Sequence, residues 1–595
     1  MQSEIKRCQN CKQEFTIEPD DFVFYEKIDV PPPTWCPECR LIRRLCFNNQ
    51  RSLYKRECNL CKNATISMYS SDAPFPVYCP RCWWSDDWDP MEYGREYDFS
   101  KSLLEQIREL QLVTPVPALS TRHQTLTNSE YVNMAHNLKN CYLLFNSDYD
   151  EGCAYGSEVE NSEDSFDMMM AESCHLSYES INCIKCYRTF FSVDCKDSQD
   201  IWFSRNLVNC TNCFGCTNLR NKKYYIFNEP HTEEEYLEKL KEFNLGSKKS
   251  IQTAKEKALE LHMKFPRKFM HGSHNVDVSG DYVHNSKDVH NTFIGTGSEH
   301  CRYCMWLIIK GNKDCYDFTQ FGENTQNVYE TVGSGINLNN VKFSAICVGD
   351  VHNVEYTQHC FGGAYLLACI GLRNKQHCIL NKQYSKESFD KLRAGVIEHM
   401  NTIPYTDNSG RTYRYGEFFP SELSPFAYNE TIAQEYFPLT KKEAEEQGYL
   451  WREPDTKDHK ITKNVDSLPD HISDIDDGIL KETIGCEHEG KCNEQCTTAF
   501  KVISSELQFY KKMNLPLPRL CPNCRHYQRL KQRNPLQLCH RKCTCDGVKS
   551  ENGAYKNTAE HFHGTDHCPN EFETPYAPER KEIVYCEQCY QTEVV

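Results

Sequence analysis

The fold is decided by a stretch that reads Cys8-Gln-Asn-Cys11, then x24, then Cys36-Pro-Glu-Cys-Arg40. A second unit, Cys58-x2-Cys61 with Cys79-x2-Cys82, follows the first at the interval Cys39-x18-Cys58. Near the other end of the chain, Cys492-x3-Cys496 continues as Cys496-x24-Cys521, Cys521-x2-Cys524 and Cys524-x18-Cys543. The x24 and x18 intervals match to the residue, which indicates a duplicated tandem pair of metal-binding modules.

Cysteine pairs at this spacing are typical of structural zinc sites, because two short loops can each supply two thiolates to one tetrahedral ion. The chain opens without the apolar stretch of a signal peptide, and no run approaches the roughly 18 apolar residues of a membrane span. We therefore expect a reduced, cytoplasmic protein, in which spaced cysteines are metal ligands rather than disulfides. We predict about four structural Zn2+ ions, held by Cys8, Cys11, Cys36, Cys39, Cys58, Cys61, Cys79, Cys82, Cys492, Cys496, Cys521, Cys524, Cys543, Cys545, Cys586 and Cys589.

The last of these sites is irregular. Cys543-x-Cys545 replaces the x2 spacing, and the long interval Cys545-x40-Cys586 separates it from Cys586-x2-Cys589. Rival ligands for this site are Cys539, Cys568, His563 and His567.

The formal net charge of −16 conceals two basic segments. Residues 36–62 carry seven basic and two acidic side chains, and residues 519–542 carry seven basic and no acidic ones. Basic ends attract phosphate, while an acidic centre resists nonspecific adsorption. In the first module the arginines at 40, 43 and 44 are spaced to share one helical face. The expected nucleic-acid contacts are Arg40, Arg43, Arg44, Arg51, Lys55, Arg56, Arg519, Arg525, Arg529, Lys531, Arg533 and Arg541.

The centre of the chain consists of two repeat arrays. In the first, small side chains recur every 12 residues with one interval of 9, each preceded by a residue that is usually turn-compatible: Ser129, Cys141, Cys153, Ser165, Cys174, Cys186, Ser198 and Cys210. In the second, pairs recur at a slightly longer period: Asn275-Val276, Asp288-Val289, His300-Cys301, Asp314-Cys315, Asn327-Val328, Asn340-Val341 and Asn353-Val354. Such a period predicts a β-solenoid, with a dry Val/Cys column beside an Asn/Asp ladder. The period leaves open whether one repeat forms a whole coil or half of a larger one.

Both arrays close with related phrases, Cys216-Thr-Asn-Leu-Arg-Asn-Lys and Cys369-Ile-Gly-Leu-Arg-Asn-Lys, each continuing to an asparagine and a charged helix. We expect each phrase and helix to cap an exposed solenoid end. The sequence thus predicts a mainly β protein with small α content, a duplicated solenoid and zinc-ribbon-like modules at both ends. The expected order is zinc modules at 1–50 and 51–95, a helical linker at 96–127, solenoid at 128–228, a helical cap at 229–270, solenoid at 271–381, a helical cap at 382–401, an irregular acidic linker at 402–485, and zinc modules at 486–537 and 538–595.

Other chemistry is weaker. The spacing Cys210-x2-Cys213-x2-Cys216 also fits iron–sulfur ligation, but Cys210 falls on the solenoid phase. A His/Asp-rich segment at 271–290 is the one dense candidate for divalent-metal chemistry outside the modules, although its residues lie at or beside repeat positions. Closed four-thiolate sites leave no coordination position for water. We therefore predict no catalytic residues and disfavour an enzyme.

Several phrases carry a resemblance. They are Phe24-Tyr-Glu-Lys before Pro31-Pro-Pro, Pro74-Phe-Pro-Val-Tyr-Cys-Pro-Arg-Cys-Trp-Trp, Leu-Arg-Asn-Lys, and the C-terminal Cys568-Pro-Asn-Glu-Phe-Glu-Thr. Over its full length the chain resembles a group of cysteine-rich multi-zinc-ribbon proteins from uncultivated, small-genome (candidate phyla) bacteria. The resemblance implies zinc at the matched cysteines and a bacterial cytoplasmic setting, and it brings no known activity with it.

The leading hypothesis from the sequence is a zinc-binding, non-enzymatic nucleic-acid-binding protein, with basic modules spaced by a rigid acidic solenoid. RNA or the ribosome is favoured over duplex DNA, because no recognition helix for a major groove is apparent. The alternative is a protein–protein scaffold built on the solenoid with the zinc modules as caps. A solenoid enzyme or carbohydrate binder is the third hypothesis.

Overall fold

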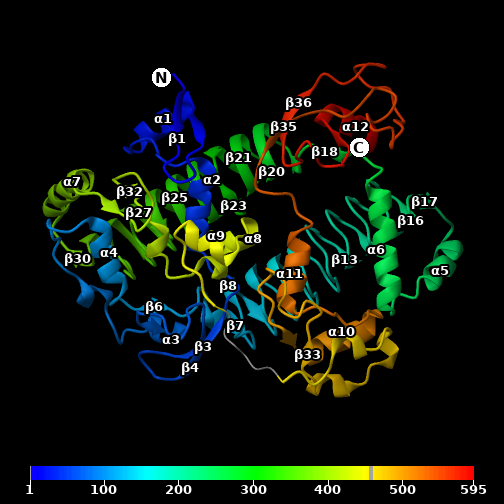
Figure 1. Cartoon of the computed structure of the whole chain (residues 1–595), viewed down its shortest axis with the longest axis horizontal. Helices are drawn as coiled ribbons and strands as arrows, with labels where there is room; N and C mark the ends of the chain where they lie inside the picture. Colours follow the sequence, from blue (N-terminus) through cyan, green and yellow to red (C-terminus); the bar gives the residue numbers. More distant parts are fainter. Residues whose placement is uncertain (1, 454–459) are drawn as a thin grey trace. The chain divides into compact units, whose positions relative to one another are not determined.

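The computed structural model describes residues 2–453 and 460–595, mostly as β-strand (Figure 1). The chain divides into two compact units. The first unit comprises Met1–Leu119, Met270–Glu453 and Leu536–Leu538, and the second comprises Ser120–Phe269, Pro454–Pro535 and Cys539–Val595. Each terminal pair of cysteine modules therefore shares a unit with the solenoid array that lies farther away in the sequence.

In the solenoid of the second unit, each coil is one sequence repeat. Parallel pairing joins residues one repeat apart, as in Phe145 with Ser157, Ser157 with Met169 and Gln199 with Thr211. A single repeat is therefore a complete coil, which answers the question that the period left open. The strands are β8 (Asn133–His136), β10 (Phe145–Asp148), β11 (Ser157–Glu160), β12 (Met169–Glu172), β13 (Tyr187–Phe190), β14 (Gln199–Trp202), β15 (Thr211–Phe214) and β16 (Lys223–Ile226).

Within each coil a shorter period of three governs the backbone. Every third residue has a positive φ, for example Asn161 (52°), Asp164 (43°) and Asp167 (56°), and each is followed by a buried residue. Left-handed backbone is easiest for Gly, Asn and Asp, which explains the turn-compatible residues noted in the sequence. All eight small side chains expected in the column are buried. The interval of 9 is three triplets, so the predicted column passes there to another side of the coil.

Small polar side chains fill these coils because they satisfy the backbone. The Ser129 Oγ accepts a hydrogen bond from the Cys141 N–H at 3.0 Å, and the Ser198 Oγ accepts one from the Cys210 N–H at 3.1 Å. The Cys210 thiol donates to the carbonyls of Val208 (3.4 Å) and Leu219 (3.5 Å). The thiols of this array thus have a structural role inside the coil.

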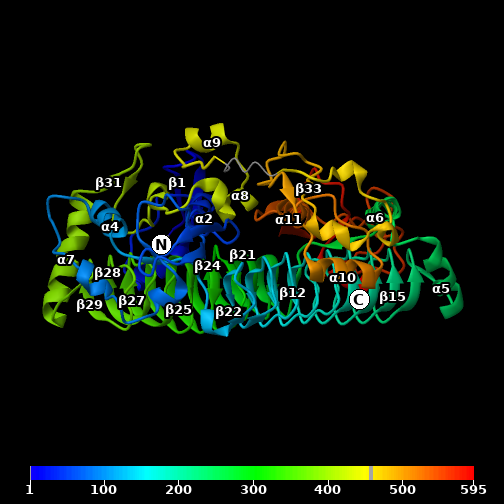
Figure 2. The same ribbon diagram turned by 90° about the horizontal axis from the view of Figure 1, so that it is seen from below.

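The coils of the first unit's solenoid vary in length. The shortest step pairs Val276 with Lys287, and the longest pairs Ser298 with Asn312. The regular part pairs Cys315 with Val328, Val328 with Val341 and Val341 with Val354 at one constant interval. Figure 2 shows the stacked coils from β24 to β29 edge-on. The strands are β19 (Gly272–Ser273), β20 (Val276–His284), β21 (Lys287–Thr296), β22 (Ser298–Arg302), β23 (Met305–Leu307), β24 (Asn312–Gly322), β25 (Thr325–Gly335), β26 (Leu338–Ala345), β27 (Val348–Glu355), β28 (Phe361–Leu367) and β29 (Gln376–Ile379).

The predicted column and ladder are confirmed in this array. Val289, Cys301, Cys315, Val328, Val341 and Val354 are fully buried. In the predicted ladder the amide of Asn340 donates to Asn353 at 2.8 Å. A second ladder, which the sequence did not predict, lies three residues earlier in each coil, where Asn324 donates to Asn337 at 2.7 Å. Val276 is the exception. It is 62% exposed, because it pairs with Lys287 in the first coil, while Val278 pairs with Val289.

Both closing phrases cap a parallel ladder. The last parallel strand turns back as an antiparallel pair, β16 with β17 (Glu229–Pro230) and β29 with β30 (Lys382–Gln383). Asn228 and Asn381 each hold the turn by accepting and donating one bond with the backbone of Thr217 and Ile370, respectively. The helices α5 (Glu233–Glu242) and α7 (Lys386–Thr402) follow, as predicted.

The expected helical linker at 96–127 contains the helix α4 (Leu103–Gln111), which begins with a Ser102/Glu105 capping box. A similar box, Thr440/Glu443, begins the short helix α9 (Lys441–Glu446). The helix α6 (Lys248–His262) also lies within the range 229–270 that was expected to be helical.

The predicted acidic linker at 402–485 instead contributes to both cores. Phe418, Phe419 and Ile432 are buried in the first unit, and Ile472 belongs to the core of the second. The aromatic and branched residues of this segment are not spaced at a regular period. Its contribution to the two cores therefore could not be predicted from the sequence. The part of the linker at 454–459 lies outside the described residues. Within the part of the chain that the structure describes, no helix is long and apolar enough to cross a membrane.

Candidate metal centres and the arginine clusters

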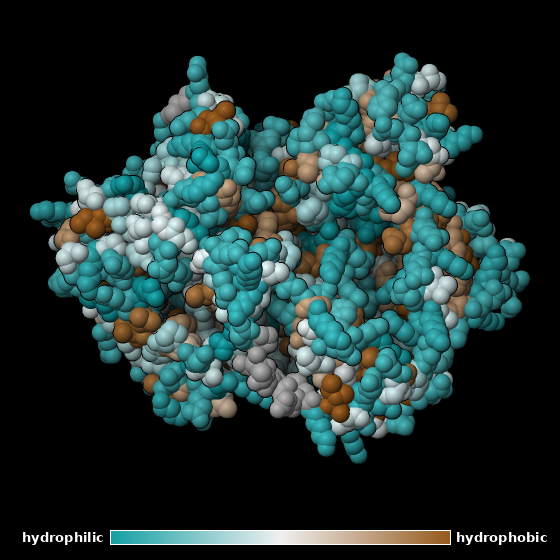
Figure 3. Space-filling model, in the orientation of Figure 1, coloured by the Kyte–Doolittle hydropathy of each residue, from teal (hydrophilic) through white to brown (hydrophobic). Residues whose placement is uncertain are grey.

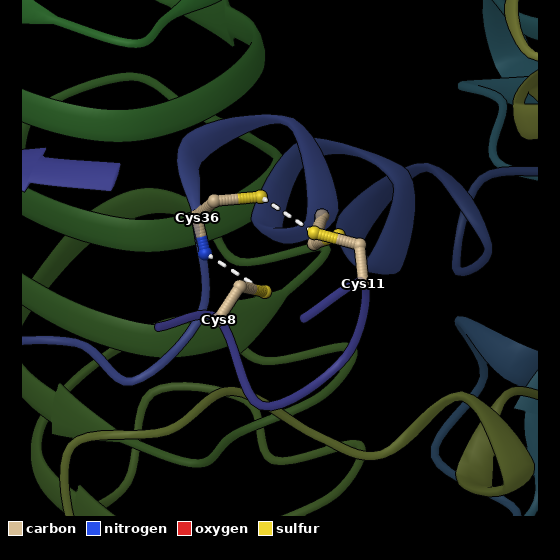
Figure 4. A group of neighbouring side chains, drawn as sticks. Cys8, Cys11 and Cys36 are labelled. Carbon is tan, nitrogen blue, oxygen red and sulfur yellow. Dashed lines mark hydrogen bonds between the residues drawn. The ribbon is translucent and has the colours of Figure 1, made fainter. Parts of the chain in front are cut away.

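The first module places four thiols around one point. Its antiparallel strands β1 (Glu4–Arg7) and β2 (Glu14–Ile17) are joined by the loop that carries Cys8 and Cys11. Cys36 is the N-cap of α2 (Pro37–Leu45), and Cys39 lies in the first turn of that helix. The thiols of Cys8, Cys11, Cys36 and Cys39 form a group of metal-binding geometry. Figure 4 shows Cys8, Cys11 and Cys36 of this group.

The distances in this group fit a tetrahedral thiolate centre. The Cys11 and Cys36 sulfurs are 3.7 Å apart (Figure 4), against an edge of about 3.8 Å expected for metal–sulfur bonds of about 2.3 Å. The Cys36 N–H donates to the Cys8 sulfur at 3.3 Å. A helix N-terminus beside the second pair also favours thiolate over thiol.

The other three modules repeat this frame. In each, the first ligand directly follows the first strand of a hairpin, and the N–H of the cysteine that caps the helix donates to its sulfur. The second module uses β3 (Tyr54–Glu57), β4 (Ala64–Ser67) and α3 (Pro80–Trp83), with the Cys79 N–H 3.2 Å from the Cys58 sulfur. Cys58, Cys61, Cys79 and Cys82 form a group as predicted. Although burial opposes ionisation, the N–H groups of Cys79, Cys61 and Leu60 lower the pKa of Cys58 to about 7.

The third module corrects one predicted ligand. The four-thiol group is Cys486, Cys496, Cys521 and Cys524, with Cys486 in the place expected for Cys492. Cys486 directly follows β33 (Ile484–Gly485), and the Cys521 N–H donates to its sulfur at 3.3 Å, as Cys36 does to Cys8. Cys492 lies beside the group, with its sulfur 3.7 Å from that of Cys524. The x3 spacing of Cys492 and Cys496 resembled a short loop that carries two ligands. In the structure the two ligands are Cys486 and Cys496, and a longer loop joins them.

The fourth module corrects another. Its group is Cys543, Cys568, Cys586 and Cys589, so Cys568 takes the place expected for Cys545. Cys543 follows β35 (Cys539–Lys542), and Cys586 caps α12 (Glu587–Val594). The sequence held a signal for this assignment, because the interval Cys568-x17-Cys586 repeats the interval Cys61-x17-Cys79 of the second module. Of the rival ligands, Cys568 is thus in the four-thiol group, and His563 belongs to a second group with His561, Cys589 and the expected ligand Cys545.

The arginines of the first module are buried against the solenoid of their own unit. α2 packs on β24 and β25, and Figure 1 shows it beside the strands of that solenoid. Its three arginines share one face, as predicted. Arg40 pairs with Asp317 at 2.8 Å, and Arg44 contacts both Asp317 and Glu330 at 3.0 Å. Each of these side chains is at most 1% exposed.

Arg43 completes this cluster. Its guanidinium contacts Glu330 at 2.6 Å and Glu417 at 3.0 Å, and it lies over the ring of Trp35 at 4.4 Å. Although burial disfavours a charged guanidinium, the carboxylates of Glu330 and Glu417 raise the pKa of Arg43. Three arginines and three carboxylates therefore balance in one buried network.

The third module has a smaller version of the cluster in the second unit. Its helix α11 (Pro522–Leu530) carries Arg525, which contacts Asp167 at 3.0 Å and Glu506 at 3.1 Å. Arg529 contacts Asp167 at 2.7 Å and donates to the Tyr155 carbonyl at 3.0 Å. Gln528, at the position of Arg43, is exposed.

These clusters correct the expected phosphate contacts. Arg40, Arg43, Arg44, Arg525 and Arg529 are buried and neutralised by carboxylates, so their guanidinium groups are not available to phosphate in this fold. A spacing that places arginines on one helical face does not say whether solvent or another element covers that face. Of the other expected contacts only Lys55 and Lys531 are exposed, while Arg51, Arg56, Arg519, Arg533 and Arg541 are half-buried.

Other candidate groups have structural partners. Trp83 and Trp88 are buried, with Arg373 over both rings at 5.5 and 5.1 Å, so they pack the second module onto the solenoid. In the His/Asp-rich segment, His271 pairs with Asp281 at 2.9 Å and His300 with Asp288 at 2.6 Å.

One pocket of the first unit mixes aromatic and charged groups. Its volume is about 730 Å3, and its lining includes Trp84, Phe361, Asp89, Arg373 and Lys375. Trp84 is 38% exposed and meets Phe361 edge to face at 4.9 Å. The pocket lies between the end of the second module and the solenoid.

Known families add nothing to this description of the sites. No protein-family model matches the chain, and no curated protein matches it.

Proposed function

We propose that the protein is a non-enzymatic binding scaffold, in which Zn2+ ions hold the terminal modules in shape and the modules clamp the flanks of the solenoids. The observation that carries this proposal is the burial of both arginine clusters. A basic helix whose arginines are buried against solenoid carboxylates stabilises its own unit. The surface that a partner can reach is then the rest of the solenoid.

Zinc is the ion that the donor sets support. Four thiolates at tetrahedral separations suit Zn2+, whereas Mg2+ and Ca2+ prefer oxygen ligands. A thiolate centre with four protein ligands has no open position for water or substrate, so it acts through folding energy rather than catalysis.

The proposed partner is a protein, and the aromatic pocket supports that choice. Interfaces are enriched in exposed Trp and Arg, and Trp84 and Arg373 lie together there with Asp89 and Lys375. The face drawn in Figure 3 is mostly hydrophilic, with small scattered apolar groups. A partly exposed tryptophan in a pocket is therefore a suitable anchor.

RNA or ribosome binding, the leading hypothesis from the sequence, remains a prediction without its main residues. It would have to rely on exposed lysines such as Lys55 and Lys531, each a single charge without a fixed planar geometry. The supposed bacterial source and cytoplasmic setting are likewise inferences from the sequence.

Recovery of the tagged full-length chain from its native host, with and without nuclease, tests the proposal. We expect to recover a protein partner that nuclease does not release. Trp84→Ala should lower the affinity for this partner at least tenfold. The matched control is Leu112→Ala, which removes a 42% exposed side chain of the same unit outside the pocket. Recovery of nucleic acid alone, with all protein released by nuclease, would overturn it in favour of the nucleic-acid hypothesis.

A further inference from the structure

The fourth module contains a second set of ligands beside its four-thiol group. Cys545, His561, His563 and Cys589 place one ligand atom each within 4.8 Å of one another. Cys589 belongs to both sets. Seven side chains therefore surround two metal positions that meet at one sulfur.

The distances of the second set fit a tetrahedral ion with mixed ligands. The Cys545 sulfur is 3.6 Å from the Nδ1 of His561, and the Cys589 sulfur is 3.3 Å from the Nε2 of His563. Metal–sulfur bonds of about 2.3 Å and metal–nitrogen bonds of about 2.05 Å predict an edge of about 3.6 Å.

Both imidazoles are held in the tautomer that a metal needs. The Nε2 of His561 lies 3.0 Å from a carboxylate oxygen of Glu593, which leaves Nδ1 free to ligate. The Nδ1 of His563 lies 2.6 Å from the Asp566 carbonyl, which leaves Nε2 free. Such outer contacts orient ligating histidines in metal sites.

Glu593 is itself fixed in place. Its carboxylate accepts hydrogen bonds from the N–H groups of Thr558 and Ala559 and from the hydroxyl of Tyr555. His561 and Cys545 are buried, at 4% and 0% exposure. One ion in the four-thiol group would leave a buried thiol facing a buried imidazole, with neither ligating a metal.

We propose that the fourth module holds a dinuclear zinc centre bridged by the Cys589 thiolate. One ion is bound by Cys543, Cys568, Cys586 and Cys589, and the other by Cys545, His561, His563 and Cys589. Five thiolates and two neutral imidazoles around two Zn2+ ions leave one net negative charge, one less than a single ion with four thiolates. This inference rests on the proposed zinc loading and is independent of the binding partner.

Metal counting on the full-length chain tests the second ion. We expect five Zn2+ ions per chain in native mass spectrometry, and four in the His561→Ala/His563→Ala variant. The matched controls are His540→Ala and His567→Ala, which change histidines of the same module outside both of these ligand groups and keep five ions. Four ions in the wild type, or five in the double variant, would overturn the proposal.

A measurement on the wild-type protein tests the bridge without a variant that could fail to fold. After exchange with 113Cd, we expect two of the five resonances to show a mutual 113Cd–113Cd coupling through the shared sulfur. Five uncoupled resonances would exclude the Cys589 bridge. A positive result in both tests would stand even if the chain recovered no protein partner, so the two proposals fail separately.

Discussion

In both units, buried arginines on a helix of a cysteine module contact carboxylates of the solenoid. The two units differ in how these arginine charges are neutralised. In the first unit, three arginines of α2 contact the carboxylates of Asp317, Glu330 and Glu417. In the second unit Asp167 contacts both Arg525 and Arg529, and Glu506 from the module itself contacts Arg525. The feature that both contacts share is an aspartate that accepts from two arginines one helical turn apart. The other carboxylates differ between the units, so this aspartate is the core of the contact.

Replacing the first ligand of equivalent modules should have the largest effect. Cys8→Ala and Cys486→Ala each open one thiolate centre, and a structural zinc ion contributes about 10–16 kcal/mol to folding. We expect each variant to lose one Zn2+ ion and to unfold its module, as measured by metal analysis and thermal unfolding. Cys492→Ala is the matched control and should retain the ion. The opposite result for Cys486 and Cys492 would restore the ligand set expected from the sequence.

Removing the shared aspartate should give the next largest effect and distinguish the two units. Breaking a buried ion pair costs about 3–5 kcal/mol, because the remaining charge has no partner. We expect Asp167→Asn to reach that range, since Asp167 is the carboxylate that contacts Arg529, and Asp317→Asn to cost less, since Arg44 keeps Glu330. Denaturant unfolding measures both.

The control for this pair is Asp200→Asn, which breaks a partly exposed contact with Arg188 and should cost less than about 1 kcal/mol. A larger loss for Asp317→Asn than for Asp167→Asn would mean that Glu330 gives no support.

The units also differ in a buried acid, which predicts a pH dependence. Asp150 lies inside a coil of the second unit, where burial raises its pKa to about 8. The first unit buries a neutral Asn312 that also accepts hydrogen bonds from the next coil. Because the folded pKa exceeds the unfolded value of about 3.9, the folded state binds the extra proton, and stability falls as pH rises from about 4 to 8.

We therefore expect Asp150→Asn to raise the free energy of unfolding by about 2–5 kcal/mol at pH 9 and to leave it unchanged near pH 4. Unfolding curves at the two pH values measure this. A gain of equal size at both would show that ionisation is not the cause.

Exchanging the third arginine position should give the smallest effects. Arg43→Gln makes the first cluster resemble the second and should cost about 2 kcal/mol, less than a complete break, because Glu330 keeps Arg44 and Glu417 keeps the Thr34 N–H at 2.9 Å. Gln528→Arg adds an exposed charge and should change stability by less than about 0.5 kcal/mol. Equal costs for the two changes would show that burial is not what distinguishes these positions.

The sequence predicted much of the fold because its periods are physical constraints. The Val/Cys column, the ladder of Asn340 and Asn353, and the caps at Asn228 and Asn381 all follow from repeats that stack one coil on the next. The period of three was missed, because its signal lies in the backbone and tolerates residues such as Lys185 at a positive φ.

The site was harder to predict, because spacing does not report what covers a surface. The spacing correctly placed Arg40 on a helical face. The partners of Arg40 and Arg525, Asp317 and Asp167, lie far away in the sequence, and no pattern in either solenoid array distinguishes these two acids. Likewise Cys486 was hidden by a longer loop, whereas Cys568 could have been found from the interval to Cys586.

The interleaved order of the two units has a consequence for synthesis on the ribosome. Arg44 is translated 273 residues before Asp317, so at about 5–20 residues per second the first module waits about 14–55 s for its partner. In the second unit the order is reversed, because Asp167 precedes Arg529 by 362 residues. One nascent half thus carries unpaired cations and the other unpaired anions, and neither unit can close its charged contact until the chain has returned to it.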